Sequence, residues 1–543
     1  MSRGDTRGGS CGRGPERLLL AVGLAVGLLF ALLYPPWAGG ADEATHFARA
    51  LEMAHGRLVP DEVDGVIGSP IPESYRRDQG EVAIRLWYAV PFDHDTVSVL
   101  DRSRPDWSQT WVVDTQPTLA ATPLAYGPPA AAMAIPDSLG WVGVKVLWAG
   151  RIGNLLTYLA VAWLALRVAT AFRWTLALAA VFPMNLGIAA SVTPDALTIS
   201  AFLLVVAVWT RVWRPPAPPV PPVPPASEPE DSQERALAAL TSTAGERFAP
   251  PTIVDSGPEG APAPAPRAWA GAVARLSAWT ATPRGTFVMV LAAGLLLVAT
   301  KPPYFLVLAA FPALVLTAWR DIRLRMAGLG AVLALLVGAV YALINSSGSY
   351  KAVTEGMGGS ITYQPDVQQE RLLSDPFGFL GRVLDDWFGH LDKTVQRWVR
   401  HVGYVEVTLP SWVSWAFVIA VVVAAVLLDR DDLVGLRRGA RAIWAVLAAA
   451  MILALYTSSY LYFDDTVEGT YMGLQVPRYV APFFAIAVMG WAPRTLVSQP
   501  RGRPLAARIP SWAPVALVVA AQVVLMVAAV RTWNFDGWTT DTS

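Results

Sequence analysis

Residues 35–60 read PPWAGGADEATHFARALEMAHGRLVP and directly follow an apolar run, LLLAVGLAVGLLFALL, over residues 18–33. Taken over residues 17–34, the run is long enough to predict a transmembrane helix. Pro35 and Pro36 end this helix, because proline cannot continue a helix interior. Gly39 and Gly40 then allow the chain to turn sharply. The stretch therefore brings the adjacent carboxylates of Asp42 and Glu43 to the point where the chain leaves the membrane.

A short amphipathic helix is predicted next. Apolar residues recur at helical spacing in it: Phe47, Ala50, Leu51 and Ala54. Asp42 or Thr45 can cap its start, and Gly56 ends it. We expect this helix to lie along the outer membrane surface and to hold Asp42 at the interface. Asp42 and His46 are four residues apart, so they face the same way.

The composition predicts a polytopic membrane protein. The chain is 54% hydrophobic and only 15% charged, and it contains 22 Trp, whereas soluble domains carry about 25% charged residues. Its formal net charge of zero argues against nucleic acid as a partner. The single cysteine, Cys11, precedes the first span, so no intramolecular disulfide is possible. Ala38-Gly39-Gly40-Ala41 resembles a signal-peptide cleavage site, but the apolar run exceeds the usual signal core and we expect a retained helix.

Apolar runs recur along the chain, and we expect an all-α fold with about eleven transmembrane helices. The predicted spans are 17–34, 145–167, 174–192, 195–213, 286–300, 303–319, 326–345, 411–428, 441–461, 477–493 and 511–530. Residues 214–285 contain PPAPPVPPVPP and other low-complexity sequence, which cannot bury enough apolar surface to fold. We interpret them as a disordered cytoplasmic linker.

Arginines predict the orientation of these spans. They concentrate in the N-terminus (1–16), the turn at 167–173, the linker 214–285, and the segments 320–325, 430–441 and 493–508. By the positive-inside rule these segments are cytoplasmic. Residues 35–144 and 346–410, together with the tail 531–543, then lie outside. Residues 35–144, the linker 214–285 and residues 346–410 separate the first helix (17–34) from three groups of helices: 145–213, 286–345 and 411–530. The richness in Ala, Val, Arg and Pro is typical of a bacterium with a high GC content, so we predict a multi-pass protein of the bacterial cytoplasmic membrane.

Four ionisable residues are predicted to share one depth near the outer membrane edge. Arg151 is 16 residues from Arg167, and Asp195 and Arg478 are each 16 residues from a cytoplasmic arginine, about 24 Å of helix. Lys301 is 19 residues from such an arginine, about 28 Å, and the hydrocarbon core is about 30 Å thick. Each charge could simply mark the end of its own span. Together, three bases and one acid favour an anionic group such as phosphate or pyrophosphate.

The acidic motif itself allows three interpretations. Asp42 could be a general base at the head group of a lipid-linked substrate. Asp42, Glu43 and His46 could bind a divalent metal, although no second cluster of ligands accompanies them. The two acids could also be residues that favour a helix start, with a surface histidine beside them.

The motif resembles the opening signature of a bacterial multi-pass membrane family known as a domain of unknown function, number twenty-one forty-two. Further matching pieces follow in the family's order: Tyr126-Gly127-Pro128, Arg151 with Asn154, residues 191–195 (SVTPD), 301–304 (KPPY), 368–376 (QQERLLSDP) and 473–482 (GLQVPRYVAP). The resemblance covers nearly the whole chain except residues 214–285. Val476-Pro477 departs from the pattern, since the family more often has a glycine there.

That family is in turn similar to GT-C class membrane glycosyltransferases, which take sugars from polyprenyl-phosphate donors. The resemblance implies that Asp42 is the catalytic base and that Glu43 is its helper or a metal ligand. It implies transfer with inversion to a cell-envelope glycan, lipid or protein on the outer face. The candidate substrate-binding residues are His46, Arg151, Asn154, Asp195, Lys301, Tyr304, Gln475, Arg478 and Tyr479. Among them, Arg151, Lys301 and Arg478 would hold the donor phosphate; no metal ligand set is favoured.

Three other functions remain open. A transporter or flippase of lipid-linked saccharides would need ionisable groups near the midplane and repeat symmetry, and no internal repeat stands out. A ligase or polymerase of lipid-linked glycans would share the phosphate site and differ in its acceptor. A non-catalytic scaffold would not need Asp42. Tryptophans of the external segments could stack on sugar rings, although anchoring or core packing explains most of them: Trp87, Trp107, Trp111, Trp387 and Trp398.

Overall fold

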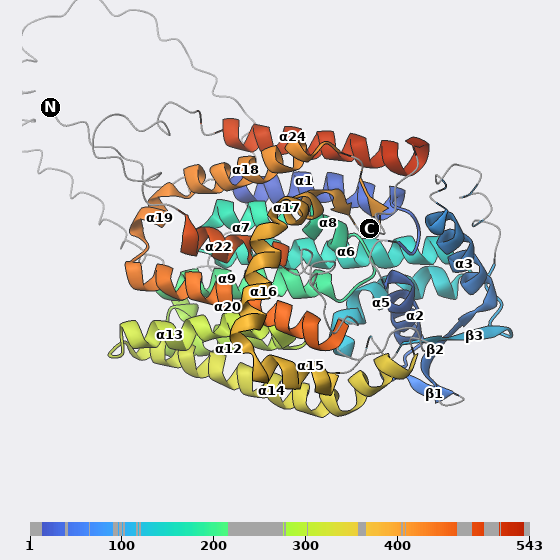
Figure 1. The fold of residues 1–543 in the computed structure, drawn as a ribbon, viewed down its shortest axis with the longest axis horizontal. Helices are drawn as coiled ribbons and strands as arrows, with labels where there is room; N and C mark the ends of the chain where they lie inside the picture. The colour runs from blue at the N-terminus through green and yellow to red at the C-terminus, as the bar shows by residue number, and fades with distance from the viewer. Residues whose placement is uncertain are drawn as a thin grey trace, which may run out of the picture.

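Long apolar helices run side by side through most of the structure (Figure 1). The computed structural model describes residues 14–38, 42–63, 66–88, 104–115, 121–214, 278–300, 302–356, 365–402, 405–407, 409–463, 480–492 and 512–536, with a few single residues between them. Within these ranges, 7 helices are long and apolar enough to cross a membrane. They are α1 (Gly14–Leu33), α6 (Gly143–Val168), α9 (Asp195–Trp213), α14 (Ile322–Gly356), α18 (Ser411–Leu428), α20 (Arg438–Phe463) and α24 (Ala513–Arg531). These helices agree with the predicted multi-pass membrane protein.

Shorter helices occupy the other predicted spans. Three of them are apolar but brief: α12 (Pro283–Val298), the 3-10 helix η2 (Pro302–Ala309) with α13 (Ala310–Thr317), and the 3-10 turn η3 (Ala481–Phe483) with α22 (Phe484–Trp491). The predicted span 174–192 is two helices, α7 (Arg173–Ala180) and α8 (Pro183–Ala189). The number of eleven crossings therefore stays a prediction.

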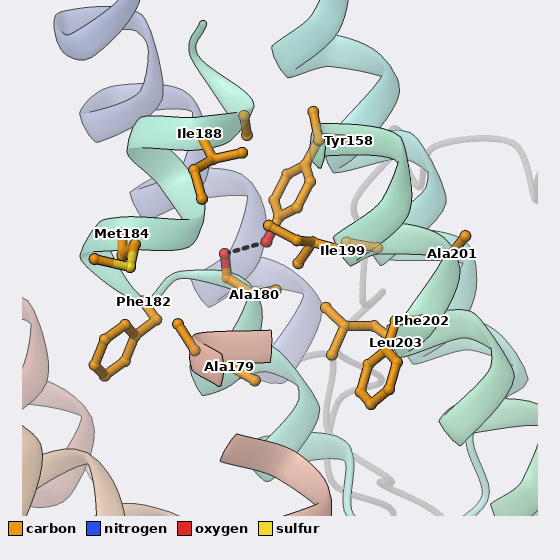
Figure 2. Close-up of a cluster of buried hydrophobic side chains, with 14 of the residues drawn as sticks. Tyr158, Ala179, Ala180, Phe182, Met184, Ile188, Ile199, Ala201, Phe202 and Leu203 are labelled. Carbon is orange, nitrogen blue, oxygen red and sulfur yellow. Dashed lines mark hydrogen bonds between the residues drawn. The ribbon is translucent and has the colours of Figure 1, made fainter. Parts of the chain in front are cut away.

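Pro183 explains the break between α7 and α8, because proline has no N–H to continue the helix. Backbone carbonyls freed in an apolar interior need other donors. Three consecutive carbonyls receive them from side chains: Ala179 O from Asn185 Nδ2 at 2.7 Å, Ala180 O from Tyr158 OH at 2.7 Å and Val181 O from Gln522 Nε2 at 2.6 Å. Figure 2 shows the Tyr158 bond inside the surrounding apolar cluster. The break is thus stabilised by α6 and α24.

The centre of the bundle is α9. In its most apolar stretch, 89% of the residues are buried, as expected for a helix that is apolar on all sides. It packs against α6 and α12, and also against η2 and η3. Because α9 begins at Asp195, this central helix has an acid at its first position.

The segment after α1 contains strands, so the prediction of an all-α fold needs correction here. Its elements are α2 (Glu43–Ala54), β1 (Asp61–Val63), β2 (Val66–Pro72), α3 (Glu73–Trp87), β3 (Thr110–Asp114) and α5 (Pro123–Ser138). The three strands form an antiparallel sheet in the order β1-β2-β3, with Ile71 opposite Trp111. Strands of three to seven residues give too short a pattern to stand out beside long apolar helices.

The second large segment is mainly helical. It comprises α15 (Pro365–Ser374), α16 (Pro376–Gly389), α17 (Leu391–Arg400) and a two-stranded pair, β4 (His401–Val402) with β5 (Val405–Glu406). The short helix α19 (Arg430–Gly435) lies at the end of the bundle that is opposite to α2 (Figure 1). The predicted linker 214–285 lies almost wholly outside the described residues. Of the tail, the structure describes only the helical turn η5 (Thr532–Asp536) and the residue before it.

Candidate functional site

The end of α1 is held by an arginine from α6. Pro35 and Pro36 stop the helix and leave its last carbonyls without helical partners. Arg151, which is fully buried, donates from Nη1 to Ala31 O at 3.2 Å and Tyr34 O at 2.9 Å, and from Nη2 to Pro35 O at 2.8 Å. Trp37 then turns the chain with a φ of 55°; the predicted turn at Gly39-Gly40 lies outside the described residues.

The charge of Arg151 is balanced by Glu43. Glu43 Oε1 accepts from Arg151 Nε at 2.8 Å and Oε2 accepts from Nη2 at 2.6 Å, while Val192 N donates to Oε1 at 2.9 Å. Both side chains have no solvent exposure. A guanidinium has five N–H groups, and the five hydrogen bonds of Arg151 use all three of its nitrogens within the protein. The pair ties α1, α2, α6 and the turn before α9 together.

This arrangement bears on two predicted roles. Arg151 as a phosphate ligand, and Glu43 as a catalytic helper or metal ligand, would each require the buried pair to open. Breaking a buried pair costs about 3–5 kcal/mol when one partner is lost. Both residues are therefore positioning residues. Within the described residues, no group of three or more His, Cys, Asp or Glu side chains is arranged to hold a metal ion.

The predicted helix after the turn is present as α2. Phe47, Ala50 and Leu51 are fully buried, and Gly56 ends the helix with a φ of 83°. The helix packs between α5 and strand β2, so its apolar face meets protein, whereas we expected it to lie along the membrane surface. Asp42 occupies the N-cap position, but its side chain makes no capping hydrogen bond and is exposed.

A second group of side chains surrounds the start of α2. His46 Nδ1 lies 2.8 Å from the hydroxyl of Tyr126, a buried residue of α5 whose hydroxyl is also 3.5 Å from Thr118 O. Burial, and next the charge of Asp195, raise the pKa of Tyr126 well above its ordinary value, and Asp42 adds to this effect. Both carboxylates therefore act on the Tyr126 hydroxyl through their charge. We call Asp42, His46, Tyr126 and Asp195 the His46 cluster.

Tyr126 was absent from the candidate site residues predicted from the sequence. Its signal was present, since Tyr126-Gly127-Pro128 is one of the family-like motifs. Tyrosine is uncharged at neutral pH, so counting residues from the cytoplasmic arginines, which indicates the depth of the charged residues, does not select it. Its contact with His46 joins residues 80 positions apart, which only the packing of α2 on α5 creates.

Asn154 holds the turn that leads into Asp195. Its Nδ2 donates to Ser191 O at 2.7 Å and to Thr193 O at 2.8 Å, and the residue is buried. Asp195 follows as the first residue of α9, and 8% of it is exposed. The structure thus brings Asp195 to the cluster and gives Asn154 a positioning contact.

Lys301, Gln475, Arg478 and Tyr479 lie outside the described residues. The described neighbours of these motifs do converge. Tyr304 is buried and lies 6.1 Å from Phe202 of α9 and 5.5 Å from Phe483, measured between ring centroids. Thr122, just before α5, donates to Ala299 O at 2.6 Å. The end of α12, the start of η2 and the residues after the 473–482 motif therefore lie beside the elements that carry the His46 cluster.

The tryptophans that could stack on sugar rings divide into an exposed pair and a packed pair. Trp107 and Trp111 are exposed by 37% and 48%, and the guanidinium of Arg76 lies 3.8 Å from the Trp111 ring centroid. Trp387 and Trp398 pack edge to face with centroids 6.2 Å apart, which is a packing contact. The side chain of Trp87 lies outside the described part.

A family model described as "Predicted membrane protein (DUF2142)" matches residues 24–221 and 263–487, which is well over half of the chain. No curated protein matches the chain, and no solved structure does.

Proposed function

We propose, from the premise that the chain belongs to the DUF2142 family of predicted membrane proteins, that it is a GT-C-type membrane glycosyltransferase. It would transfer a sugar from a polyprenyl-phosphate donor to a cell-envelope glycan, lipid or protein on the outer face of the cytoplasmic membrane. The observation that supports this best is the contrast between two adjacent acids. Glu43 is buried against Arg151, whereas Asp42 is exposed and has no capping bond.

This contrast suits a general base. A base must be held in place while its oxygen remains accessible to the acceptor hydroxyl. The Glu43–Arg151 pair fixes the first turn of α2, and with it the backbone of Asp42. In the proposed reaction Asp42 accepts the proton of the acceptor hydroxyl, and the acceptor oxygen forms a bond to the anomeric carbon. The bond from that carbon to the phosphate oxygen breaks, and the phosphate leaves with the electron pair.

The remaining residues would serve the donor. Lys301 and Arg478 keep their predicted role at the phosphate, where cations stabilise the developing charge. Asp195, His46 and Tyr126, which form the His46 cluster with Asp42, would line the approach of the substrate to it. The residues Gln475, Tyr479 and Tyr304 belong to the same motifs and stay predicted contacts of the substrate. Membrane lipids would surround the site, and the donor would reach it by lateral diffusion in the bilayer.

The test uses purified protein in lipid bilayers, a panel of labelled polyprenyl-phosphate sugars, and measurements with and without a chelator. Asp42→Asn keeps the shape of the side chain and removes its basic oxygen. We expect turnover to fall by about 10²–10⁴-fold, with donor binding and thermal stability retained. Asp106→Asn is the matched control, because Asp106 is a fully exposed acid of the same segment. Turnover at the wild-type rate in Asp42→Asn would remove Asp42 as the base. Absence of transfer from every donor by the wild-type protein would count against the glycosyltransferase itself.

A further inference from the structure

Helix α16 presents three chemically different sectors around its axis. At about 100° per residue, Phe377, Leu384 and Phe388 fall within about 40° of one another. Arg382 and Asp385 form a neighbouring exposed sector. The third sector is buried and consists of Phe379, Val383 and Asp386. A water-exposed helix on a protein surface needs only two of these sectors, one buried and one polar.

The exposed apolar sector is large. Phe377 is 84% exposed, Phe388 is 68% exposed and Leu384 is 48% exposed. Leu380, at the edge of the same sector, is 38% exposed. Phenylalanine and leucine side chains are stabilised when they leave water, and contiguous apolar patches of this kind mark interaction surfaces. The sector therefore requires an apolar environment.

The depth of α16 indicates which environment this is. Its buried sector packs on α20: Asp386 Oδ2 accepts from Tyr456 OH at 2.8 Å, and the rings of Phe379 and Tyr460 lie 5.3 Å apart. Tyr456 and Tyr460 follow Arg441 by 15 and 19 residues, or about 22 and 28 Å of helix. Arg441 donates to Ala492 O where α22 ends, near the α19 end of the bundle. Since the hydrocarbon core is about 30 Å thick, α16 contacts α20 near the opposite edge of that core.

The direction of α16 agrees with this depth. It runs across the long axes of α20, α14 and the other long helices (Figure 1). A helix that crosses the spans lies along the membrane plane. The helices that α16 crosses are also exposed and apolar in places, among them at Val446 of α20 (66%) and Val340 of α14 (56%). The apolar sector of α16 therefore has the same character as the exposed surface of these long helices.

We propose that α16 is an interfacial helix that lies in the bilayer leaflet on the α2 side, with Phe377, Leu384 and Phe388 among the acyl chains. Arg382 and Asp385 then face the lipid head groups and water, as the polar sector of an interfacial helix does. The partner of this surface is the lipid bilayer. The segment 346–410 thus contributes a membrane-bound helix in addition to external structure, and this holds whether or not the protein transfers a sugar.

Spin labels test the proposal in the full chain. The only cysteine, Cys11, is changed to serine, and single cysteines are placed at Phe377, Leu384 and Phe388, and at Arg382 and Asp385 as matched controls. The five labelled proteins are reconstituted in phosphatidylethanolamine–phosphatidylglycerol bilayers. Collision of each label with oxygen, which concentrates in acyl chains, is compared with collision with a water-soluble nickel chelate. A label at Val446 provides the lipid-facing reference.

We expect the oxygen-to-nickel ratio at the three apolar positions to approach that of Val446 and to exceed that of Arg382 and Asp385 several-fold. All these positions are exposed, so the labels should not disturb packing. Equal ratios at both sets of positions would show a helix in water and overturn the proposal. Labels at Phe377, Leu384 and Phe388 that collide with neither reagent would show a protein partner, such as a second copy of the chain, and would overturn it as well.

Discussion

The two ends of the helix bundle both bury carboxylates, but they use them differently. At the α19 end, Asp429 accepts from Thr175 N at 2.6 Å, Thr175 Oγ1 at 2.7 Å and Trp174 N at 3.3 Å, and Asp432 accepts from Phe172 N at 2.8 Å. Both acids bind the start of α7, where unpaired N–H groups and the helix dipole favour negative charge. At the α2 end, Glu43 is paired in the same thorough way, yet its neighbour Asp42 is exposed.

The difference separates assembly from chemistry. An acid whose oxygens all accept hydrogen bonds inside the protein contributes to stability, and it is poorly placed to accept a proton from a substrate. At the α19 end, Asp429 and Asp432 stabilise the fold. The α2 end combines a stabilising carboxylate with an exposed one, since the Glu43–Arg151 pair holds the helix that presents Asp42. Substitutions at the two ends should therefore divide into those that change stability and the one, Asp42→Asn, that changes turnover alone.

The largest effect on stability is expected from Arg151→Met. It removes every bond to the end of α1 and leaves Glu43 buried without its cation, which costs about 3–5 kcal/mol. Thermal unfolding in detergent, followed by loss of monodisperse protein, measures the change. The double variant Arg151→Met with Glu43→Leu should regain only the part of the loss that comes from the unpaired charge of Glu43, because the carbonyls at the end of α1 and Val192 N still lack a partner. A single variant as stable as the wild type would mean that the pair does not hold the α2 end together.

Asp429→Asn should have an intermediate effect. Asparagine keeps one oxygen but turns an N–H₂ group toward Thr175 N or Trp174 N, so that hydrogen bonds to a charged acceptor worth about 1.5–3 kcal/mol are lost. The same thermal assay measures the loss. Because Asp429 lies at the α19 end, the activity of the protein that remains folded should be unchanged. A fall in turnover together with the fall in stability would contradict the assignment of stability to the α19 end and of turnover to the α2 end.

Tyr126→Phe should have the smallest effect on stability. It removes only the contact of the hydroxyl with His46 Nδ1 and Thr118 O, and a neutral hydrogen bond contributes about 0.5–1.5 kcal/mol. The Nδ1 atom of His46 should then lose this hydrogen-bond partner, and its nitrogen chemical shift, followed by nuclear magnetic resonance of labelled histidine, should change. An unaltered Nδ1 chemical shift would show that Tyr126 does not position this ring and would reduce the His46 cluster to its two acids and the histidine.

Much of the candidate site could be found from local sequence. The prolines at 35 and 36, the apolar spacing that forms α2 and the stop at Gly56 all act over a few residues. Asp42 and Asp195 stand next to predicted spans, and His46 follows Asp42 by four residues, so local sequence also indicates these three residues. Tyr126 was missed because it is uncharged, and the short strands of the sheet were missed because their patterns are brief.

The sequence by itself determined which segments enter an apolar phase and where each helix must stop, since backbone hydrogen bonding and burial follow local pattern. The tertiary structure decided which polar groups meet. Arg151 binds Glu43, which is 108 residues away in the chain, and Gln522 donates to the carbonyl of Val181, which is 341 residues away. A buried polar group must find a partner, but the sequence does not say which one, because that choice depends on how all the helices pack. For this reason only the folded chain distinguishes Glu43, which stabilises the bundle, from Asp42, which it leaves exposed.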